Sequence, residues 1–177
     1  MPIRRFETKH PRIAASAYID PQALVIGDVE IGADSSLWPN VVVRGDIHFI
    51  NIGANTNIQD GSVLHVSHDS EFAPGGFPLI VGDGVTVGHM VVLHGCTIES
   101  NCLIGMGSIV MDGARVLAGA MLGAGSLVAP GKVLQGGYLW HGRPARQARP
   151  LTADEQRYLR YSADHYVRLK NRHRSAN

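Results

Sequence analysis

The sequence predicts a mainly β protein, a left-handed parallel β-helix of hexapeptide repeats with a C-terminal α-helix packed along it. Two observations predict the β-helix: an aliphatic residue stands at every sixth position, and glycine directly follows many of these residues. A third observation, a helix-capping sequence followed by residues at helical spacing, predicts the C-terminal helix. Because the chain has 177 residues, we expect it to form a single domain.

The aliphatic ladder covers most of the chain. It runs without a miss from Ile13 to Val43 and again from Ile98 to Leu134, while two insertions and one dropped residue shift its register in between. Its members are Ile13, Ile19, Val25, Ile31, Leu37, Val43, Ile52, Ile58, Leu64, Val81, Val87, Leu93, Ile98, Ile104, Val110, Val116, Leu122, Val128 and Leu134. An α-helix cannot place every sixth residue on one face. A prism with three short strands per coil can, because each strand then points one aliphatic side chain inward.

Glycine recurs in step with this ladder, as in Ile31-Gly32 and Val87-Gly88. It supplies the unusual backbone angles and the close approach that the corners of a prism need. Stacked coils should lie about 4.8 Å apart, the usual distance between hydrogen-bonded strands. Residues with the same offset from the ladder in adjacent coils should therefore form columns.

Residues outside the ladder complete the predicted organisation. Thr152 is the expected N-cap of the helix, because Glu155 stands three residues later and can close a capping box. The larger insertion, residues 67–78, leaves the ladder just after His65 and should overhang that edge of the prism. The predicted segments are an N-terminal arm at 1–12, the β-helix at 13–135, a connector at 136–151 and the helix at 152–171.

The composition argues against several classes of function. The net charge of +1 offers no electrostatic reason to expect a nucleic acid or an anionic membrane as partner. No apolar run approaches the roughly 18 residues of a membrane-spanning helix, and the first residues lack the apolar stretch of a signal peptide. Cys96 and Cys102 are too few for a disulfide framework, and we expect both to be buried as small hydrophobic residues. These features favour a reduced, cytoplasmic protein.

Two histidines share one column of the predicted prism. His65 directly follows Leu64, and His94 directly follows Leu93, each on the third step of its coil. The two imidazoles should therefore lie one coil apart, near 5 Å, where they can share a ligand. Arg44 stands in the same column one coil below.

A third histidine lies on another face. His89 comes two residues after Val87, on the second step of its coil, and Asp60 stacks beneath it with Gln59 alongside. Side chains on different faces of a prism diverge, so His89 should meet the other two histidines only from a neighbouring chain. A threefold arrangement of chains would create three identical sites in this way.

Three neutral imidazoles with an open fourth position are the ligand set of a hydrolytic or hydrating zinc site. Zinc in such a site lowers the pKa of its bound water to about 7 and so provides hydroxide at neutral pH. The sequence therefore predicts a metal centre shared between two chains.

Four segments together resemble the gamma-class carbonic anhydrase family of hexapeptide-repeat proteins, in its short bacterial-type branch. They are Arg44-Gly45-Asp46, Asn57-Ile58-Gln59-Asp60, His65, and Val87-Gly88-His89-Met90 through Leu93-His94-Gly95-Cys96. The resemblance covers nearly the whole chain, including the terminal helix.

This resemblance implies a homotrimer that hydrates CO2 reversibly to bicarbonate. It implies zinc, or Fe²⁺ or Co²⁺ in its place, held by His65 and His94 of one subunit and His89 of the next. It further implies that residues matching Arg44 and Asp46 pair across the interface. Those matching Gln59 and Asp60 would line the site and position the bound water or CO2.

The chain departs from the family's archaeal prototype at three places. Ile47 stands where the prototype has a glutamate, and His68, in the 67–78 insertion, stands near the place of its proton-shuttling glutamate. Tyr161 matches a site tyrosine of the terminal helix, but Ala163 replaces the asparagine that follows. Because fast hydration needs a proton shuttle, a catalytically weak metal-binding trimer is an alternative function.

A second alternative is an acyl- or acetyltransferase, an enzyme class that also uses hexapeptide prisms and an interface histidine. Such an enzyme needs one catalytic base rather than a stacked pair of histidines with a complement on another face. It also has no structural requirement for a metal. Metal content and coenzyme A binding therefore separate the two functions.

Overall fold

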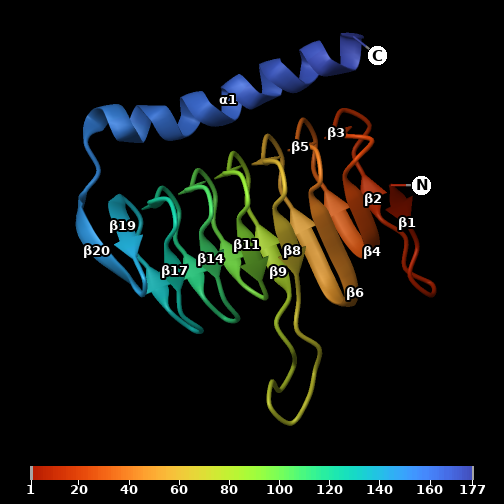
Figure 1. Cartoon of the computed structure of the whole chain (residues 1–177), viewed down its shortest axis with the longest axis horizontal. Coiled ribbons are helices and arrows are strands. Elements are labelled where there is room, and N and C mark those ends of the chain that lie inside the picture. The colour runs from red at the N-terminus through yellow and green to blue at the C-terminus, as the bar shows by residue number, and fades with distance from the viewer. Residues whose placement is uncertain (1, 177) are drawn as a thin grey trace.

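The computed structural model describes residues 2–176 and confirms the predicted fold, a parallel β-helix with one α-helix along it (Figure 1). Its elements in chain order are β1 (Ile3–Arg4), β2 (Arg12–Ile13), β3 (Tyr18–Ile19), β4 (Leu24–Ile31), β5 (Ser36–Leu37), β6 (Val42–Ile52), β7 (Asn57–Ile58), β8 (Val63–His65), β9 (Leu79–Val81), β10 (Thr86–Val87), β11 (Val92–His94), β12 (Thr97–Ile98), β13 (Leu103–Ile104), β14 (Ile109–Val110), β15 (Arg115–Val116), β16 (Met121–Leu122), β17 (Leu127–Val128), β18 (Val133–Leu134), β19 (Tyr138–Gly142), β20 (Ala145–Pro150) and α1 (Ala153–Ala176).

The strands stack into three faces of a prism. One face holds β8, β11, β14 and β17, a second holds β9, β12, β15 and β18, and the third runs from β3 to β19 through β10. Strands that neighbour each other along these stacks pair in parallel, and ladder residues stand opposite ladder residues, as Leu64 does opposite Leu93. The longer strands β4 and β6 continue around one corner and join the first two faces.

The ladder side chains form the core. Every ladder residue from Val25 to Leu134 is at most 2% exposed, whereas Ile13 and Ile19 in the first coil are partly buried. Cys96 and Cys102 are free and buried, as expected, and burial raises the pKa of Cys102 to about 11. No helix within residues 2–176 is long and apolar enough to cross a membrane.

The segment predicted as a connector, residues 136–151, is more regular than expected. β19 pairs in parallel with β16 and places Trp140 opposite Leu122, so the ladder continues for one more step. The prediction missed this step because the ladder was sought among Ile, Leu and Val. β20 then turns back antiparallel to β19 and closes that end of the prism.

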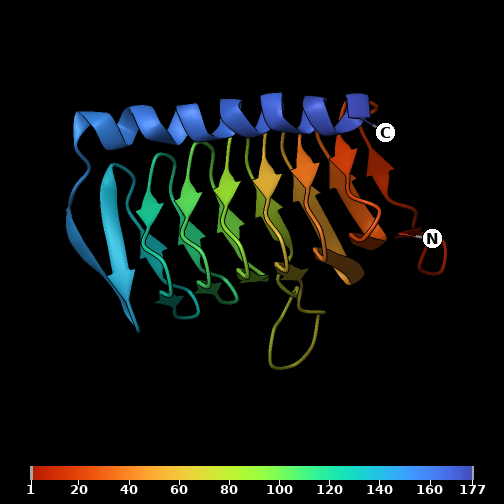
Figure 2. The same ribbon diagram turned by 45° about the horizontal axis from the view of Figure 1, so that its top comes forward.

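Helix α1 returns along the third face toward the first coil, as Figures 1 and 2 show. Its predicted capping box is present, since Thr152 N donates to Glu155 and Glu155 N donates to Thr152 Oγ1. The helix ends at Ala176, five residues beyond the predicted end at 171.

Near its C-terminal end the helix is fixed by a buried charge. Lys170 is 1% exposed, and its ammonium donates at 2.7 Å to both Ser16 O and Asp34 Oδ1. Because Ser16 and Asp34 belong to the first coils, this contact fastens the end of the chain to its beginning.

Candidate metal centre

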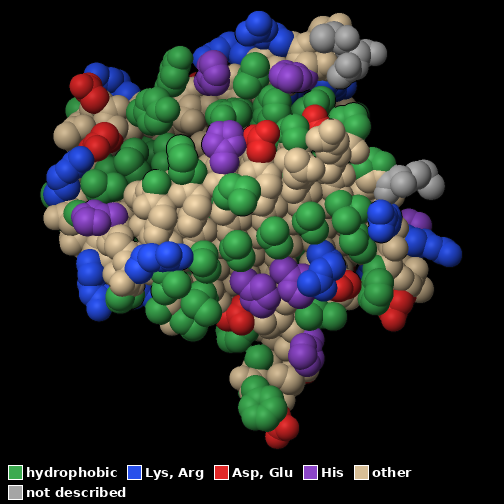
Figure 3. All heavy atoms as spheres, viewed as in Figure 1, with side chains coloured by type: hydrophobic (Ala, Val, Ile, Leu, Met, Phe, Trp, Pro, Cys, Tyr) green, Lys and Arg blue, Asp and Glu red, His purple; other side chains and the backbone are tan. Residues whose placement is uncertain are grey.

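The first half of the candidate site is the histidine column on β8 and β11. These strands pair so that His94 stands directly opposite His65, as the sixfold ladder predicted. Nδ1 of His65 lies 3.2 Å from Nε2 of His94, and the ring centroids are 5.1 Å apart. On the face shown in Figure 3, histidine side chains flanked by acidic and basic ones lie beside the base of a projecting loop.

Each of these two rings binds a carboxylate through its other nitrogen. Asp46 Oδ1 lies 3.1 Å from Nε2 of His65, and Asp112 Oδ1 lies 2.6 Å from Nδ1 of His94. An ionised carboxylate can only accept, so each carboxylate takes the N–H of its neutral imidazole. The two nitrogens that face each other are then both unprotonated, with their lone pairs directed into the same space.

The electrostatics of Asp46 and His65 favour this protonation state. Burial lowers the pKa of His65, and its hydrogen bond to Asp46 only partly offsets this effect. Burial alone would raise the pKa of Asp46, but hydrogen bonds from Arg44 and His65 outweigh it, and the pKa is lowered. At neutral pH, Asp46 is therefore an ionised carboxylate beside the neutral imidazole of His65.

The facing nitrogens fit a zinc ion. Zinc binds imidazole nitrogen at about 2.0–2.1 Å and prefers tetrahedral angles of about 109°. Two nitrogens 3.2 Å apart would subtend about 100° at a cation held at those distances. Without a shared cation or proton, two lone pairs this close repel each other. The donor set, imidazoles oriented by carboxylates, is typical of protein zinc sites.

Two further contacts support the carboxylates. The guanidinium of Arg44 donates to Asp46 Oδ2 at 2.6 Å, and the hydroxyl of Ser67 donates to Asp112 Oδ2 at 2.9 Å. Arg44 and Asp46 thus pair with each other within one chain. The pairing across an interface that the family resemblance implied remains a prediction.

The second half of the candidate site is His89, which follows β10 on the third face. Its Nδ1 lies 2.9 Å from Asp60 Oδ2, the stacking that the ladder offsets predicted. The side chain of His89 is 47% exposed. Within residues 2–176, no three histidine, cysteine or carboxylate side chains lie close enough together to hold a metal ion. The structure therefore brings two of the three predicted ligands together in one chain.

His89 lies beside a groove of about 440 Å³ between the third face and helix α1. Gln59, a predicted site residue, also lines this groove and is 6% exposed, with its Nε2 donating to Asn57 at 3.1 Å. The remaining lining residues are Thr86, Gly88, Leu103, Ile104, Gly105, Met106, Met121, Tyr158, Ser162 and Tyr166. The groove is mostly apolar, with Gln59, Thr86, His89 and Ser162 among its polar side chains.

Tyr161 and His68 are not brought to these histidines within one chain. Tyr161 is 56% exposed on helix α1 and does not line the groove, where Tyr158 and Tyr166 lie instead. His68 is exposed on the projecting loop. Among the described residues, neither His65 nor any other side chain forms a hydrogen bond or ion pair with it. Their catalytic roles remain predictions.

Sequence reasoning missed Asp112, the partner of His94. The signal was available, because Asp112 comes two residues after the ladder residue Val110, in the coil that follows His94. A carboxylate at that offset stands next to the histidine column, just as Asp60 stands next to His89. Asp112 therefore belongs to the candidate site, in addition to the residues that the sequence predicted.

Named relatives match the chain over nearly its whole length. It is 52% identical over 169 residues to the Escherichia coli protein called Protein YrdA, covering 96% of this chain and 92% of that one. It is 47% identical to a carbonic anhydrase of Geobacillus kaustophilus, covering 92% and 85%. It is also 43% identical to the mitochondrial gamma carbonic anhydrase 1 of Arabidopsis thaliana, covering 96% of this chain and 61% of that protein.

Residues 10–45 match the family described as bacterial transferase hexapeptide (six repeats).

Solved structures share the prism. A hexapeptide transferase family protein from Anaplasma phagocytophilum superimposes with a TM-score of 0.88 at 40% identity, covering 96% of each chain. The N-acyltransferase AntD of Bacillus cereus, solved with coenzyme A, has a TM-score of 0.61 at 14% identity, covering 93% and 87%. That last likeness concerns the fold alone.

Proposed function

Because the chain belongs to the gamma-class carbonic anhydrase family of hexapeptide-repeat proteins, we propose that it catalyses the reversible hydration of CO2 to bicarbonate. The observation that carries this proposal is the pair of ring nitrogens on His65 and His94 that face each other across 3.2 Å, while the other nitrogen of each ring contacts a carboxylate. A transferase base would need neither the second imidazole nor the opposed lone pairs.

The proposed assembly is a homotrimer with a metal centre at each interface. His65 and His94 of one copy would hold the metal together with His89 of the next copy. Support comes from the shared chemistry of the three rings, since each already has a carboxylate on one nitrogen and keeps the other for a ligand. Zinc suits this set, and Fe²⁺ or Co²⁺ can take the same ligands.

Zinc in such a site makes a nucleophile available at neutral pH by acidifying water. The side chains around it have the remaining tasks. Asp46, Asp60 and Asp112 fix the tautomers of the three imidazoles, so that the nitrogen without a proton faces the shared centre in each ring. Gln59 uses one amide N–H on Asn57, and we assign its remaining polar atoms, with Asp60, to positioning CO2 and water.

Proton export is the remaining requirement of the reaction. His68 is proposed for this step because it lies three residues from His65 and is exposed to solvent. Tyr161 is proposed to act from the helix of a neighbouring copy. A weak catalyst with an intact metal centre would result if neither group moves protons fast enough.

Metal content, oligomeric mass and rate test the proposal together. We expect about one zinc per chain, the mass of a trimer, and stopped-flow CO2 hydration above the buffer rate with zinc or with iron loaded under anaerobic conditions. His89→Ala should abolish stoichiometric metal, whereas His10→Ala, which removes an exposed imidazole elsewhere, should not. A metal-free monomer after reconstitution would exclude the proposed centre.

The competing function is acyl transfer, suggested by the 40% identity to a solved structure described as a hexapeptide transferase family protein. Calorimetric titration with coenzyme A separates the two. Coenzyme A binding by a metal-free protein would support the transferase, and metal without coenzyme A binding would support the hydration enzyme.

A further inference from the structure

The loop beside the histidine pair ends in an exposed aromatic side chain. Residues 67–77 form a short hairpin, with isolated bridges between Ser67 and Phe77 and between Ser70 and Ala73. Phe72 at its tip is 90% exposed, more than any other large hydrophobic residue of the described chain. Four residues of extended chain carry the tip roughly 13 Å beyond the edge of the prism.

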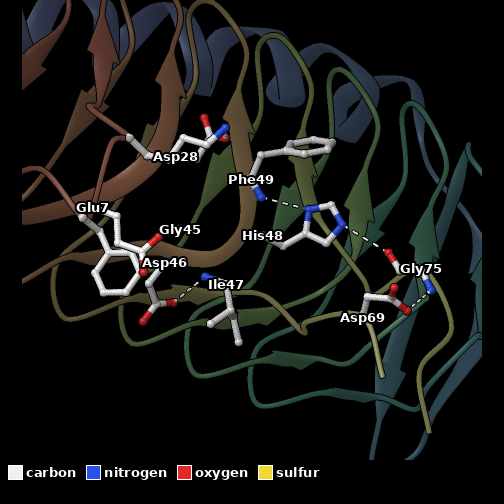
Figure 4. A pocket seen from close by; sticks show the side chains of 11 residues that line it. Glu7, Asp28, Gly45, Asp46, Ile47, His48, Phe49, Asp69 and Gly75 are labelled. Atoms are coloured by element: carbon white, nitrogen blue, oxygen red, sulfur yellow. Dashed lines mark hydrogen bonds and ion pairs between the residues drawn. The ribbon is translucent and has the colours of Figure 1, made fainter. Parts of the chain in front are cut away.

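The base of this loop is fixed, so the tip points in a defined direction. Figure 4 shows His48, on β6, accepting a hydrogen bond from Phe49 N and contacting Gly75 O at 3.3 Å. Asp69 accepts from Gly75 N at 2.7 Å. The hydroxyl of Ser67 reaches Asp112, which orients His94. The loop is therefore anchored both to the prism and to the candidate metal centre.

Helix α1 carries a row of exposed side chains on one stripe of its surface. Tyr158, Tyr161, His165 and Arg168 follow one another at spacings of three and four residues, which places them on one stripe of the helix. The rings of Tyr161 and His165 are stacked with centroids 6.0 Å apart, and the guanidinium of Arg168 lies 5.9 Å from the centre of the Tyr161 ring. Tyr158 and Tyr161 are 51% and 56% exposed, so this stripe presents aromatic surface to solvent.

The loop and this row cannot meet within one chain. Figures 1 and 2 both show the loop and helix α1 at opposite edges of the prism. They come together between two copies, an inference that rests on the proposed function. The shared metal centre brings His89 of one copy to His65 and His94 of the other. Tyr158 lines the same groove as His89, so the helix of the first copy arrives beside the loop of the second.

We propose that Phe72 of one copy packs on Tyr161 of the next, while Glu71 pairs with Arg168. The chemistry is complementary, because an acid followed by an aromatic ring meets an aromatic ring with a guanidinium over it. Glu71 is exposed and has no hydrogen bond or ion pair among residues 2–176. The contact would place the loop of one copy near Tyr158 of the next, which lines the groove beside His89.

Intersubunit crosslinking tests the contact directly. The double variant Phe72→Cys with Tyr161→Cys would be treated with a short bismaleimide, since packed rings leave their Cα atoms farther apart than a disulfide spans. The native Cys96 and Cys102 are buried, so the unmodified protein should remain uncrosslinked. The matched control is Phe72→Cys with Arg160→Cys, because Arg160 lines a different groove on the other flank of the helix.

We expect covalent dimers and trimers from the Tyr161 pair in roughly tenfold or greater excess over the control pair, since the assembly holds the thiols at high effective concentration. Equal yields from both pairs in a metal-containing trimer would overturn the contact and leave the proposed function standing. A metal-free monomer would overturn both.

Charge reversal gives a second measurement. In the crosslinking background, Glu71→Arg and Arg168→Glu should each lower the yield several-fold, because like charges then face each other. Combining them should restore the yield, which a merely structural effect of either change would not do. Failure of the double reversal to recover crosslinking would remove the Glu71–Arg168 pair from the proposal.

Discussion

Asp112 accepts a hydrogen bond from Nδ1 of His94 over 2.6 Å and a second one from the hydroxyl of Ser67. The imidazole is thereby held in one tautomer, with Nε2 toward His65. A carboxylate partner of this kind raises the basicity of a histidine ligand and fixes the plane of its ring. Asp112 should therefore influence metal affinity without touching the metal.

Asp112→Asn tests this role. The amide keeps the shape of the side chain but is a weaker acceptor, so we expect metal affinity to fall about 10- to 100-fold in a chelator competition assay. Thermal stability of the metal-free protein should change little. Asp164→Asn, which removes an exposed carboxylate from helix α1, is the matched control. Equal affinities for the two variants would contradict the orienting role.

The buried ammonium of Lys170 predicts an asymmetry between the two halves of an ion pair. Asp34→Asn leaves the charge of Lys170 buried with weaker acceptors, and we expect a loss of about 2 kcal/mol in the free energy of unfolding. Lys170→Met removes the charge altogether, and Ser16 O keeps a donor in Arg174 at 2.8 Å. The methionine variant should therefore lose less, as measured by urea denaturation. The opposite order would show that the pair itself is strongly favourable.

Two glycines with the same backbone conformation should respond differently to alanine. Gly27 and Gly75 have φ of +82° and +79°, so either substitution incurs left-handed strain of roughly 1–2 kcal/mol. At Gly75 a new methyl group would meet nothing, whereas at Gly27 it would clash with the carbonyl oxygen of Gly45. We expect Gly27→Ala to cost about 1–3 kcal/mol more than Gly75→Ala in denaturant unfolding. Similar losses would mean that the backbone relaxes where Gly27 of β4 pairs with Gly45 of β6.

The capping box predicts a specific acid sensitivity. Hydrogen bonds from Arg149 and then from Thr152 N lower the pKa of Glu155 from an ordinary 4.5 to about 2. Because the folded-state pKa is the lower one, the stabilisation is fully present above pH 4.5 and is lost as pH falls toward 2.

Comparison with Glu155→Gln isolates this contribution from that of other carboxylates. The difference in melting temperature between the native chain and the variant should be constant at neutral pH. It should then narrow as the pH is lowered through the interval from about 4.5 to about 2. Circular dichroism at a series of pH values measures it. A difference independent of pH would show that the carboxylate charge is irrelevant to the cap.

The prism and the histidine column were predictable because both follow from the six-residue period of the aliphatic ladder. A period of six assigns each residue to a face and a coil, so His94 could be placed above His65 without coordinates. Asp60 beneath His89 followed from the same rule. Once an offset is known, hydrogen-bonded strands leave little freedom to the side chain.

Other features depend on contacts that a count does not contain. The last step of the ladder is filled by Trp140, an aromatic residue that a ladder defined by Ile, Leu and Val does not include. The helix continues to Ala176 because Lys170 and Arg174 find partners in the first coil. The ladder period also does not fix the rotation of helix α1 about its axis, so it does not place Tyr161, which is exposed.

Helix α1 also affects how the β-helix unfolds. Stacked repeats contact only their nearest neighbours, so a bare solenoid can peel open from either end. Here the terminal helix spans the stack and is tied through Lys170 to the coil that would otherwise detach first. We expect the opening of the first coil to require release of the helix, which makes unravelling a concerted event rather than a progressive one.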